Sequence, residues 1–292
     1  MLDTVTLLLG DCAEKLKEIP DASIDLIVTS PPYDNLREYK GYSFDFDLIA
    51  KELLRVLKTG GILVWVVGDA MVNRSETGSS FKHALGFMNT GFLLHDTMIY
   101  AKTTCPFPSK VRYKQAFEFM FVFAKDIPKT INLLKDRPNI TAGRNLSKRL
   151  GTRRQKNGEL LHIPEHRRNK VINETGVRFN IWYYKTGIGM HETKAAHAHP
   201  ATYPLQLAKD HILSWSNEGD IVLDPFLGSG TTGVAAVELG RKFIGIEIAP
   251  EYFDLSKQRI ENATYQEPIP ESDQIANITV TSEYDEIDWD NP

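Results

Sequence analysis

The sequence is poor in cysteine: its 292 residues include only two, Cys12 and Cys105. Two cysteines cannot build a disulfide framework, and without a C-x-x-C pair nothing indicates a zinc site. The chain also has no run of about 18 apolar residues and no charged-then-apolar leader, so we expect neither a membrane span nor a secretory signal. These absences favour a reducing cytoplasm as the location of the protein.

Basic residues are absent from residues 266–292, which carry eight acidic residues. Residues 126–198 show the opposite bias, with 15 Lys and Arg against six Asp and Glu, although the whole chain has a net charge of only −4. Such separation of charge along one chain predicts a nucleic-acid-facing segment and an acidic tail. Residues 263–292 are also poor in structure formers, and we expect them to be disordered.

Apolar runs of strand length alternate with helical patterns over most of the chain, which predicts an α/β sheet with parallel pairing. The expected strands are 5–9, 24–29, 62–67, 92–102, 117–125, 221–223 and 242–248, and the expected helices are 13–19, 46–57, 81–89, 204–215, 231–239 and 252–262. The Lys-Thr-Gly-Gly sequence at 58–61 is predicted to end the second helix. The alternation fails between 126 and 198, so we expect an inserted module there.

The apolar run at residues 24–28 stops at a double proline, in the sequence Thr29-Ser30-Pro31-Pro32-Tyr33. Proline donates no hydrogen bond to a sheet and restricts the backbone, so a buried strand is expected to end here in a stiff turn. The turn would hold a hydroxyl, peptide carbonyls and an aromatic ring at the carboxyl end of a strand. Ligands bind at that edge in open parallel sheets.

A second apolar run, residues 221–223, leads into the loop Asp-Pro-Phe-Leu-Gly-Ser-Gly-Thr-Thr at 224–232. Its glycines fit the pattern G-x-G-x-x-G, and Glu247 follows 19 residues after Gly228. This pattern is compatible with NAD and with a nucleoside cofactor, because the acidic residue would bind ribose hydroxyls in either case. Asp224 and Phe226 favour S-adenosylmethionine, which has an ammonium group and an adenine but no pyrophosphate. NAD would also leave the double-proline turn without a role.

The double-proline turn suits the chemistry of a base amino group, which is a poor nucleophile because its lone pair is delocalised into the ring. The Ser30 hydroxyl and the Pro31 carbonyl could accept the amino hydrogens and so free the lone pair. Tyr33 can stack on a base that has swung out of the duplex. Positioning supplies most of the remaining work, since a sulfonium methyl is already electrophilic. Cytosine C5 methylation is disfavoured because neither cysteine lies in a suitable Pro-Cys loop.

With the sequences Ser-Pro-Pro-Tyr at 30–33 and Phe-Leu-Gly-Ser-Gly at 226–230, the chain resembles the DNA amino-methyltransferases, which modify cytosine N4 or adenine N6. The order of the two motifs, with the basic segment between them, is similar to the permuted class labelled beta. The resemblance covers residues 5–262 and is weak between 126 and 198. It implies a Rossmann-like class I methyltransferase fold, with a mostly parallel seven-stranded sheet in which the two loops follow adjacent strands.

The resemblance also implies roles for individual residues. Asp11 would bind the cofactor adenine, Glu247 its ribose, and the sequence His-Pro-Ala-Thr-Tyr-Pro at 199–204 would close over the methionine end. Residues 1–125 and 199–262 become two halves of the methyltransferase domain, and 126–198 the target-recognition region. The expected catalytic residues are Ser30, Pro31, Pro32 and Tyr33, and the expected cofactor-binding residues are Asp11, Cys12, Thr29, His199, Ala201, Tyr203, Asp224, Phe226, Gly228, Ser229, Gly230, Thr231, Thr232 and Glu247.

Basic side chains of the middle segment are expected to bind DNA phosphates with a marked salt dependence. The expected DNA-binding residues are Arg37, Arg144, Lys148, Arg149, Arg153, Arg154, Arg167 and Arg168. Residues 182–184 are interpreted as a small core of this segment. The aromatic residues that alternate from Phe117 to Phe123 are interpreted as one buried face of a strand. A histidine cluster at 191–199 invites a metal site, but no carboxylate or cysteine cluster accompanies it, so no metal is predicted.

The family resemblance favours cytosine N4 as the target, because Ser-Pro-Pro-Tyr is similar to the cytosine enzymes; adenine N6 stays the alternative, since a serine can accept a hydrogen bond from either amine. Methyl transfer to RNA or to a protein glutamine, and a non-catalytic nucleic-acid-binding module, are the further alternatives. Duplex DNA is the expected partner. The sequence does not determine which DNA sequence is recognised or whether the protein forms a homodimer. A cognate restriction endonuclease, as found in restriction-modification systems, is a further possible partner.

Overall fold

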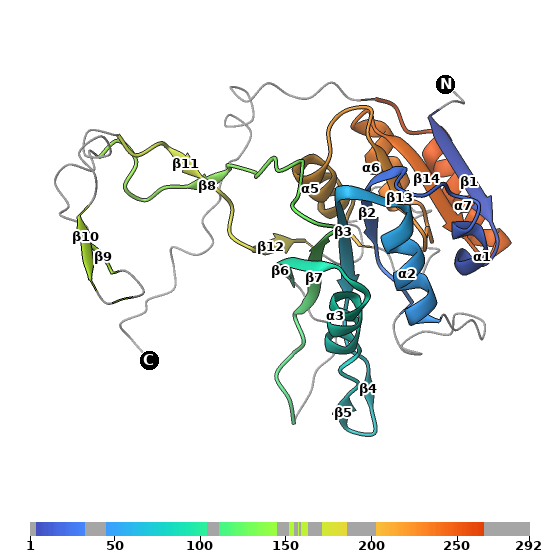
Figure 1. Ribbon diagram of the computed structural model, residues 1–292, viewed down its shortest axis with the longest axis horizontal. Helices are drawn as coiled ribbons and strands as arrows, with labels where there is room; N and C mark the ends of the chain where they lie inside the picture. Colours follow the sequence, from blue (N-terminus) through green and yellow to red (C-terminus); the bar gives the residue numbers. More distant parts are fainter. Residues whose placement is uncertain are drawn as a thin grey trace.

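A mixed sheet forms the centre of the protein in the computed structural model (Figure 1). The structure describes residues 4–32, 45–103, 111–144, 152–154, 157, 159–162, 171–185 and 203–265. Within this part of the chain the sheet has eight strands, in the order β1-β14-β13-β2-β3-β7-β6-β12. Their bounds are β1 Val5–Leu9, β2 Ile24–Thr29, β3 Leu57–Val67, β6 Leu93–Lys102, β7 Phe117–Ala124, β12 Ile181–Tyr184, β13 Ile221–Asp224 and β14 Lys242–Glu247.

Most neighbouring strands are parallel, as expected, and only β7 runs antiparallel to its two neighbours, β3 and β6. The sheet has one strand more than the seven expected. The eighth, β12, comes from the basic middle segment and pairs with β6. Its Trp182 and Tyr184 are buried in the main core, while Tyr183 is 67% exposed. The prediction of a separate small core at 182–184 was therefore wrong, because these residues alternate as a strand that covers the sheet edge.

Helices cover both faces of the sheet and give it two hydrophobic cores. One core contains buried side chains of α5 (Leu205–Trp215), α6 (Thr231–Glu238) and α7 (Pro250–Glu261), and the other contains those of α1 (Cys12–Leu16), α2 (Phe46–Val56) and α3 (Ser79–Thr90). Successive residues of β2 point to opposite cores, since Leu26 and Val28 lie in the first and Ile27 in the second. A strand covered on both faces reads as one continuous apolar run, which explains the patterns in the sequence.

The junction between α2 and β3 differs from the prediction. Residues 58–61 do not form a helix end; they belong to β3, which starts at Leu57 directly after the helix. The Lys58 ammonium lies 2.7 Å from Asp25 of β2, and a Cβ added to Gly61 would lie 2.9 Å from the Asp25 carbonyl oxygen. The glycine therefore permits close approach of two backbones rather than the end of a helix.

An arm of antiparallel ribbons extends away from the β12 edge of the sheet (Figure 1). It consists of the described residues between 137 and 176, which are 137–144, 152–154, 157, 159–162 and 171–176. Next to the sheet, β8 (Arg137–Pro138) pairs with β11 (Thr175–Gly176), and farther out β9 (Thr152–Arg154) pairs with β10 (Leu160–His162). The arm therefore occupies the interval in which the alternation of strands and helices fails in the sequence.

A network of charges fixes the root of the arm to α5. Arg178 donates to Asp136, which precedes the arm, and its Nη1 lies 2.6 Å from the Oδ2 atom of Asp210 on α5. The carboxylate of Asp210 is buried and also accepts hydrogen bonds from Tyr184 and Gln206, each at 2.7 Å. Such a buried carboxylate is stable only while its partners remain in place.

We predict that Arg178→Met lowers the free energy of unfolding by about 2 kcal/mol, because Asp210 loses a charged hydrogen-bond donor in a buried site. Lys17→Met is the matched control, since Lys17 forms an exposed pair with Glu14 and pairs of that kind contribute at most about 1 kcal/mol. Urea denaturation measures both variants. Equal losses in the two variants would contradict the role given to the network.

Candidate active site at the carboxyl edge of the sheet

The two loops singled out in the sequence meet at the carboxyl edge of the sheet. They follow β2 and β13, which are adjacent and parallel, with Leu223 opposite Ile27. The Thr29 hydroxyl donates to Oδ1 of Asp224 at 2.6 Å, and the Thr232 hydroxyl donates to the Val28 carbonyl at 3.3 Å. These bonds cross from one loop to the other, so the expectation that the loops follow adjacent strands is confirmed.

The double-proline turn leaves the sheet at the end of β2, as predicted. Thr29 and Pro31 are buried, whereas Ser30 and Pro32 are partly exposed. The turn thus continues the buried end of β2 into a surface at which Ser30 can reach a ligand. Tyr33 and Arg37 lie outside the described residues, so their predicted roles stay predictions.

Asp224 is the centre of the second loop and is only 2% exposed. Its Oδ1 atom accepts from Thr29 and from the Phe226 amide at 3.1 Å, and its Oδ2 atom accepts from the Thr232 hydroxyl at 2.6 Å. Burial raises the pKa of the Asp224 carboxyl from 3.8 to about 6, and the hydrogen bonds from the two threonines offset part of that rise. Asp224 therefore offers a desolvated negative charge that a cationic ligand group would stabilise.

The glycine loop makes a compact turn at the start of α6. Gly228 and Gly230 both have positive φ, at 52° and 81°, which glycine adopts without strain. A Cβ added to Gly230 would lie 2.9 Å from the Ser256 Cβ on α7. Ser229 and Thr231 are buried at this turn. The backbone thus approaches the neighbouring helix α7 closely.

Glu247, at the end of β14, fixes the glycine loop from the other side. Its Oε2 atom accepts from the Gly228 amide at 2.7 Å, and its Oε1 atom accepts from the Ala249 amide at 2.9 Å. The side chain is 8% exposed, and burial raises its pKa. The acidic residue predicted from its spacing therefore lies beside the glycines.

Asp11 and Cys12 follow β1, the neighbour of β14. The Gly10 amide donates to the Glu247 carbonyl at 2.8 Å, which brings the loop after β1 next to the end of β14. Asp11 is exposed and caps α1 by accepting from the Ala13 amide at 2.8 Å. Cys12 is 7% exposed, and burial raises the pKa of its thiol to about 12. A thiol of this kind is a packing residue rather than a nucleophile.

Two further predicted positions border the cofactor loop. The Tyr203 hydroxyl forms a hydrogen bond with the Thr232 hydroxyl, and burial raises the pKa of Tyr203 well above its ordinary value. The Phe226 ring lies edge-on to Trp65 of β3, with ring centroids 6.0 Å apart. His199 and Ala201, which the sequence assigns to the same element as Tyr203, lie outside the described residues.

Two residues near these loops were not predicted from the sequence. Asp69 follows β3, is 8% exposed, and accepts from the Ser80 amide at 2.9 Å, so it fixes the start of α3. The signal was available, because Gly68-Asp69 after a strand repeats the Gly10-Asp11 pattern. The Arg259 guanidinium on α7 donates to the Ser229 hydroxyl at 2.9 Å. Its contact depends on how α7 packs, which no local pattern shows.

Of the eight residues predicted to bind DNA, the structure describes only one side chain, that of Arg144, which is exposed on the arm. The backbone of Arg153 and Arg154 forms part of β9, but their side chains lie outside the described part of the chain. The remaining predicted residues, Arg37, Lys148, Arg149, Arg167 and Arg168, also lie outside it.

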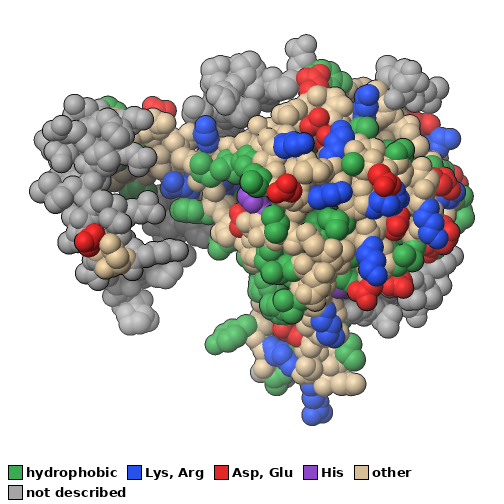
Figure 2. All heavy atoms as spheres, in the orientation of Figure 1, with side chains coloured by type: hydrophobic (Ala, Val, Ile, Leu, Met, Phe, Trp, Pro, Cys, Tyr) green, Lys and Arg blue, Asp and Glu red, His purple; other side chains and the backbone are tan. Residues whose placement is uncertain are grey.

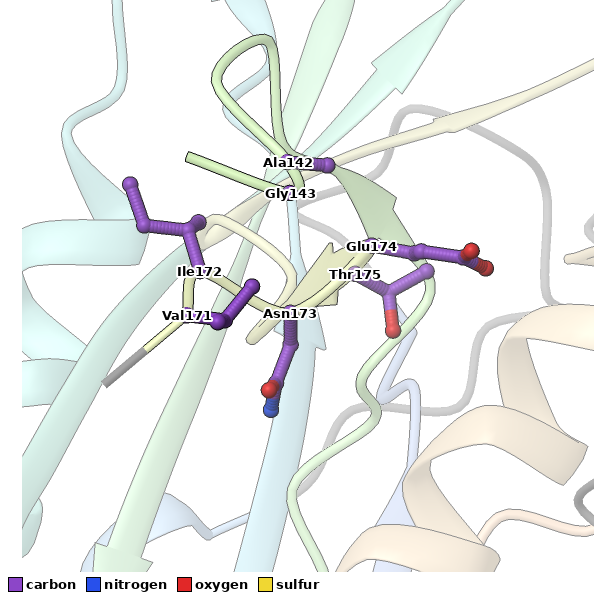
Figure 3. A pocket seen from close by; sticks show the side chains of 7 residues that line it. All are labelled: Ala142, Gly143, Val171, Ile172, Asn173, Glu174 and Thr175. Carbon is purple, nitrogen blue, oxygen red and sulfur yellow. The ribbon is translucent and has the colours of Figure 1, made fainter. Parts of the chain in front are cut away.

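An open depression of about 640 Å³ lies on the arm (Figure 3). Ala142 and Gly143 line one side and residues 171–175 the other, and the Asn173 side chain carries its amide away from the strand pair. The depression contains none of the predicted catalytic or cofactor-binding residues, so we place the candidate active site at the two loops instead.

The described residues contain no group of three or more His, Cys, Asp or Glu side chains that could hold a metal ion. None of the helices in the described ranges has the length and hydropathy of a membrane span.

Known proteins match this chain over most of its length. The profile of the DNA methylase family matches residues 24–258, which contain both loops. The orphan methyltransferase M.BamHII of Bacillus amyloliquefaciens is 53% identical over 251 residues, covering 84% of this chain and 92% of that protein. The DNA adenine methyltransferase YhdJ of Escherichia coli is 29% identical over 265 residues, or 89% of this chain and 84% of YhdJ.

Two solved structures have a similar fold. TTHA0409 of Thermus thermophilus, in complex with S-adenosyl-L-methionine, gives a TM-score of 0.60 at 28% identity and covers 89% of this chain and 94% of its own. The cytosine-N4-specific PvuII DNA methyltransferase gives a TM-score of 0.64 and covers 94% of this chain and 90% of its own. Its identity is 21%, so this likeness concerns the fold alone.

The raised pKa of Asp224 leads to a prediction about stability. Between pH 3.8 and about 6 the folded protein holds a proton on Asp224 that the unfolded chain has lost, so this carboxyl destabilises the fold progressively as pH rises through that window. Asp224→Asn cannot ionise. We predict that its free energy of unfolding rises relative to the native protein by up to about 3 kcal/mol across the window and then stays level.

Urea denaturation at a series of pH values measures this difference, and Asp254→Asn, which removes an exposed carboxylate on α7, is the matched control. A difference that does not change with pH, or that equals the difference for Asp254→Asn, would contradict the desolvation of Asp224.

Proposed function

The chain belongs to the DNA methylase family, and from that premise we propose that it transfers a methyl group to the N4 amino group of cytosine in duplex DNA. The methyl donor of the family is S-adenosyl-L-methionine. The observation that carries the proposal is the pair of hydroxyl bonds, Thr29 to Asp224 and Thr232 to Val28, that joins the double-proline turn to the glycine loop.

The residues of the glycine loop fit the chemistry of this donor. S-adenosyl-L-methionine has an ammonium and a carboxylate group, ribose hydroxyls and an adenine, and when bound it supplies an electrophilic methyl on a sulfonium. Asp224 offers a buried negative charge of the sign that an ammonium needs. We assign Asp224 to the amino-acid end, Glu247 to the ribose hydroxyls and Asp11 to the adenine. The glycines at 228 and 230 would let the backbone approach the donor closely.

We assign activation of the target amine to the double-proline turn. The Ser30 hydroxyl and the Pro31 carbonyl would accept the two amino hydrogens, so that the nitrogen lone pair turns toward the methyl group. Two consecutive prolines restrict the backbone, and Thr29 is fixed by its bond to Asp224, so the acceptors cannot relax away as the charge develops. As the nitrogen–methyl bond forms, the sulfur–methyl bond of the donor would break and leave S-adenosyl-L-homocysteine. The Ser30 hydroxyl would pass the lost amino proton on to solvent, because a neutral hydroxyl cannot retain it.

Cytosine N4 is favoured because Ser-Pro-Pro-Tyr is similar to the motif of the cytosine enzymes. Adenine N6 is the second candidate, since the relative YhdJ is described as a DNA adenine methyltransferase. The hydroxyl of Ser30 can accept from either amine. We also propose that the protein belongs to the beta class, because Ser-Pro-Pro-Tyr precedes Phe-Leu-Gly-Ser-Gly in the chain.

The remaining assignments concern the DNA. We propose that the arm, together with the other residues of 126–198, recognises the target sequence, and that 1–125 and 199–262 form the two halves of the catalytic domain. A two-stranded β-ribbon has a suitable width for the major groove. The arm is built from such ribbons and projects from the sheet edge (Figure 1), which supports this role.

The first test identifies the product. Purified protein is incubated with S-adenosyl-L-methionine and a diverse duplex DNA, and the DNA is digested to nucleosides that are separated and weighed by mass spectrometry. We predict N4-methylcytosine. N6-methyladenine would replace the cytosine assignment by the second candidate, and the absence of any methylated nucleoside, with donor binding verified, would contradict the proposal as a whole.

The second test addresses the turn. We predict that Ser30→Ala lowers kcat by about 100-fold, because it removes one preorganised acceptor of the amino group. The affinity for S-adenosyl-L-homocysteine, measured by calorimetry, should stay near that of the native protein. Ser23→Ala, which removes a hydroxyl that only closes the turn before β2, is the control, and an equal loss of kcat in both variants would refute the role of Ser30.

A further inference from the structure

We propose that two exposed segments, residues 71–76 and 111–114, form a second surface that binds duplex DNA, separate from the arm. We call them the edge surface. The inference rests on the proposed function and deepens it, because it names a DNA-contacting site outside the basic segment at 126–198.

The register of the sheet places both segments at the edge that carries the active site. β3 is parallel to β2, with Trp65 opposite Thr29, so residues beyond Val67 lie at the edge where the double-proline turn begins. β7 is antiparallel to β3, with Phe119 opposite Val67. Residues 111–116, which lead into β7, therefore reach the same edge from the opposite direction.

The two segments contact each other, and hydrogen bonds fix the point at which the first segment joins the rest of the protein. Strands β4 (Met71–Val72) and β5 (Ser75–Glu76) form a hairpin, which the Thr77 amide closes by donating to the Ala70 carbonyl at 3.0 Å. The Arg112 guanidinium donates to the Arg74 carbonyl at the tip of the hairpin. Asp69 holds the start of α3 directly behind the hairpin.

The turn of the hairpin has an unusual sequence for its backbone. Asn73 and Arg74 both have positive φ, at 48° and 66°, and a two-residue turn of this kind strongly favours Asn-Gly. An arginine at the second position costs free energy that a glycine would not. Nothing in the packing of the hairpin demands this arginine, since its side chain is exposed. A strained position that carries an exposed cation points to a ligand of opposite charge.

The side chains of the edge surface suit a duplex. Three of them are basic (Arg74, Arg112 and Lys114), and the one acidic residue in the two segments is Glu76. Two further carboxylates lie close in sequence to the segments. Asp69 accepts a hydrogen bond from the Ser80 hydroxyl, and Glu118 forms an ion pair with Lys102. Arg and Lys at this density provide contacts to phosphates.

Apolar and aromatic side chains stand among these cations. Tyr113 is fully exposed at 101%, Val111 is 88% exposed, and Met71 and Val72 are 43% and 49% exposed. Figure 2 shows basic and hydrophobic side chains together on the projection formed by the β4–β5 hairpin. Proteins that hold a base out of the helix combine these two kinds of side chain, since cations bind phosphates while apolar groups contact sugars or fill gaps between bases.

The edge surface and the arm project from the sheet in different directions (Figure 1). The arm leaves at β12 and the hairpin leaves after β3, beside the double-proline turn. A duplex that the arm reads is then contacted on a second side, close to the base that reacts.

The test compares two triple variants of equal charge change in the full-length protein. The edge variant is Arg74→Ala, Arg112→Ala and Lys114→Ala, and the control replaces three exposed lysines on other surfaces, Lys51, Lys242 and Lys257, by alanine. Fluorescence anisotropy measures binding of a labelled duplex in the presence of S-adenosyl-L-homocysteine at several salt concentrations. We expect the edge variant to bind about tenfold more weakly, with a salt slope smaller in magnitude by about 2.7, since each of the three lost phosphate contacts removes about 0.9.

The outcomes separate this inference from the proposed function. If the native protein methylates DNA and the edge variant matches the control in dissociation constant and salt slope, the edge surface is refuted and the proposed function stands. If the native protein methylates no DNA, the proposed function itself fails.

A single variant distinguishes loss of DNA binding from loss of stability. Arg74→Gly relieves the backbone at positive φ and removes the charge, so we expect an unchanged or higher Tm together with weaker DNA binding. A lower Tm, or DNA binding equal to that of the native protein, would overturn the role of the hairpin.

Discussion

The buried carboxylate of Asp224 is the constraint on which the rest of the site depends. It sits almost without solvent at the end of a central strand, and it is held by hydroxyls of Thr29 and Thr232 and by the amide of Phe226. Through Thr29 the same carboxylate joins the neighbouring strand just where the double-proline turn begins. A desolvated charge in this position lowers the stability of the ligand-free protein. The same charge favours binding of a cationic ligand, so the site gains affinity at a cost in stability.

The fold serves this arrangement by making the carboxyl edge rigid. Helices on both faces bury most residues of β2, β3 and β13, including those at their carboxyl ends, so the loops that follow these strands start from fixed positions. The loop after β1 and the end of β14 are tied by the bond from Gly10 to Glu247. Five strand ends thus contribute to one edge, and the arm is anchored to α5 through Arg178 and Asp210. The proposed catalytic loops and the proposed DNA-binding arm therefore share one framework, as sites on rigid scaffolds require.

Much of this edge could be predicted from the sequence, because its signals are local. A double proline ends one strand, and an Asp-Pro followed by paired glycines ends another. Both strands are mostly apolar, so a position in the middle of a parallel sheet could be expected for both. The eighth strand could not be predicted in this way. In the sequence, Trp182 and Tyr184 form a short aromatic cluster with no distinctive pattern. Their pairing with the edge of β6 becomes visible only in the folded sheet. The Lys-Thr-Gly-Gly sequence gave a wrong prediction for a similar reason, since Gly61 permits the close approach of Asp25 on another strand. Contacts such as that of Arg259 with Ser229 depend on helix packing alone.

The central claim is that the double-proline turn and the glycine loop form one site. The most direct measurement is a crystal structure of the protein with S-adenosyl-L-homocysteine. We predict that the ligand lies between the two loops, with its amino group near Asp224, its ribose near Glu247 and its sulfur facing Ser30. A ligand bound in the depression on the arm, or at the glycine loop with its sulfur directed away from Ser30, would contradict it.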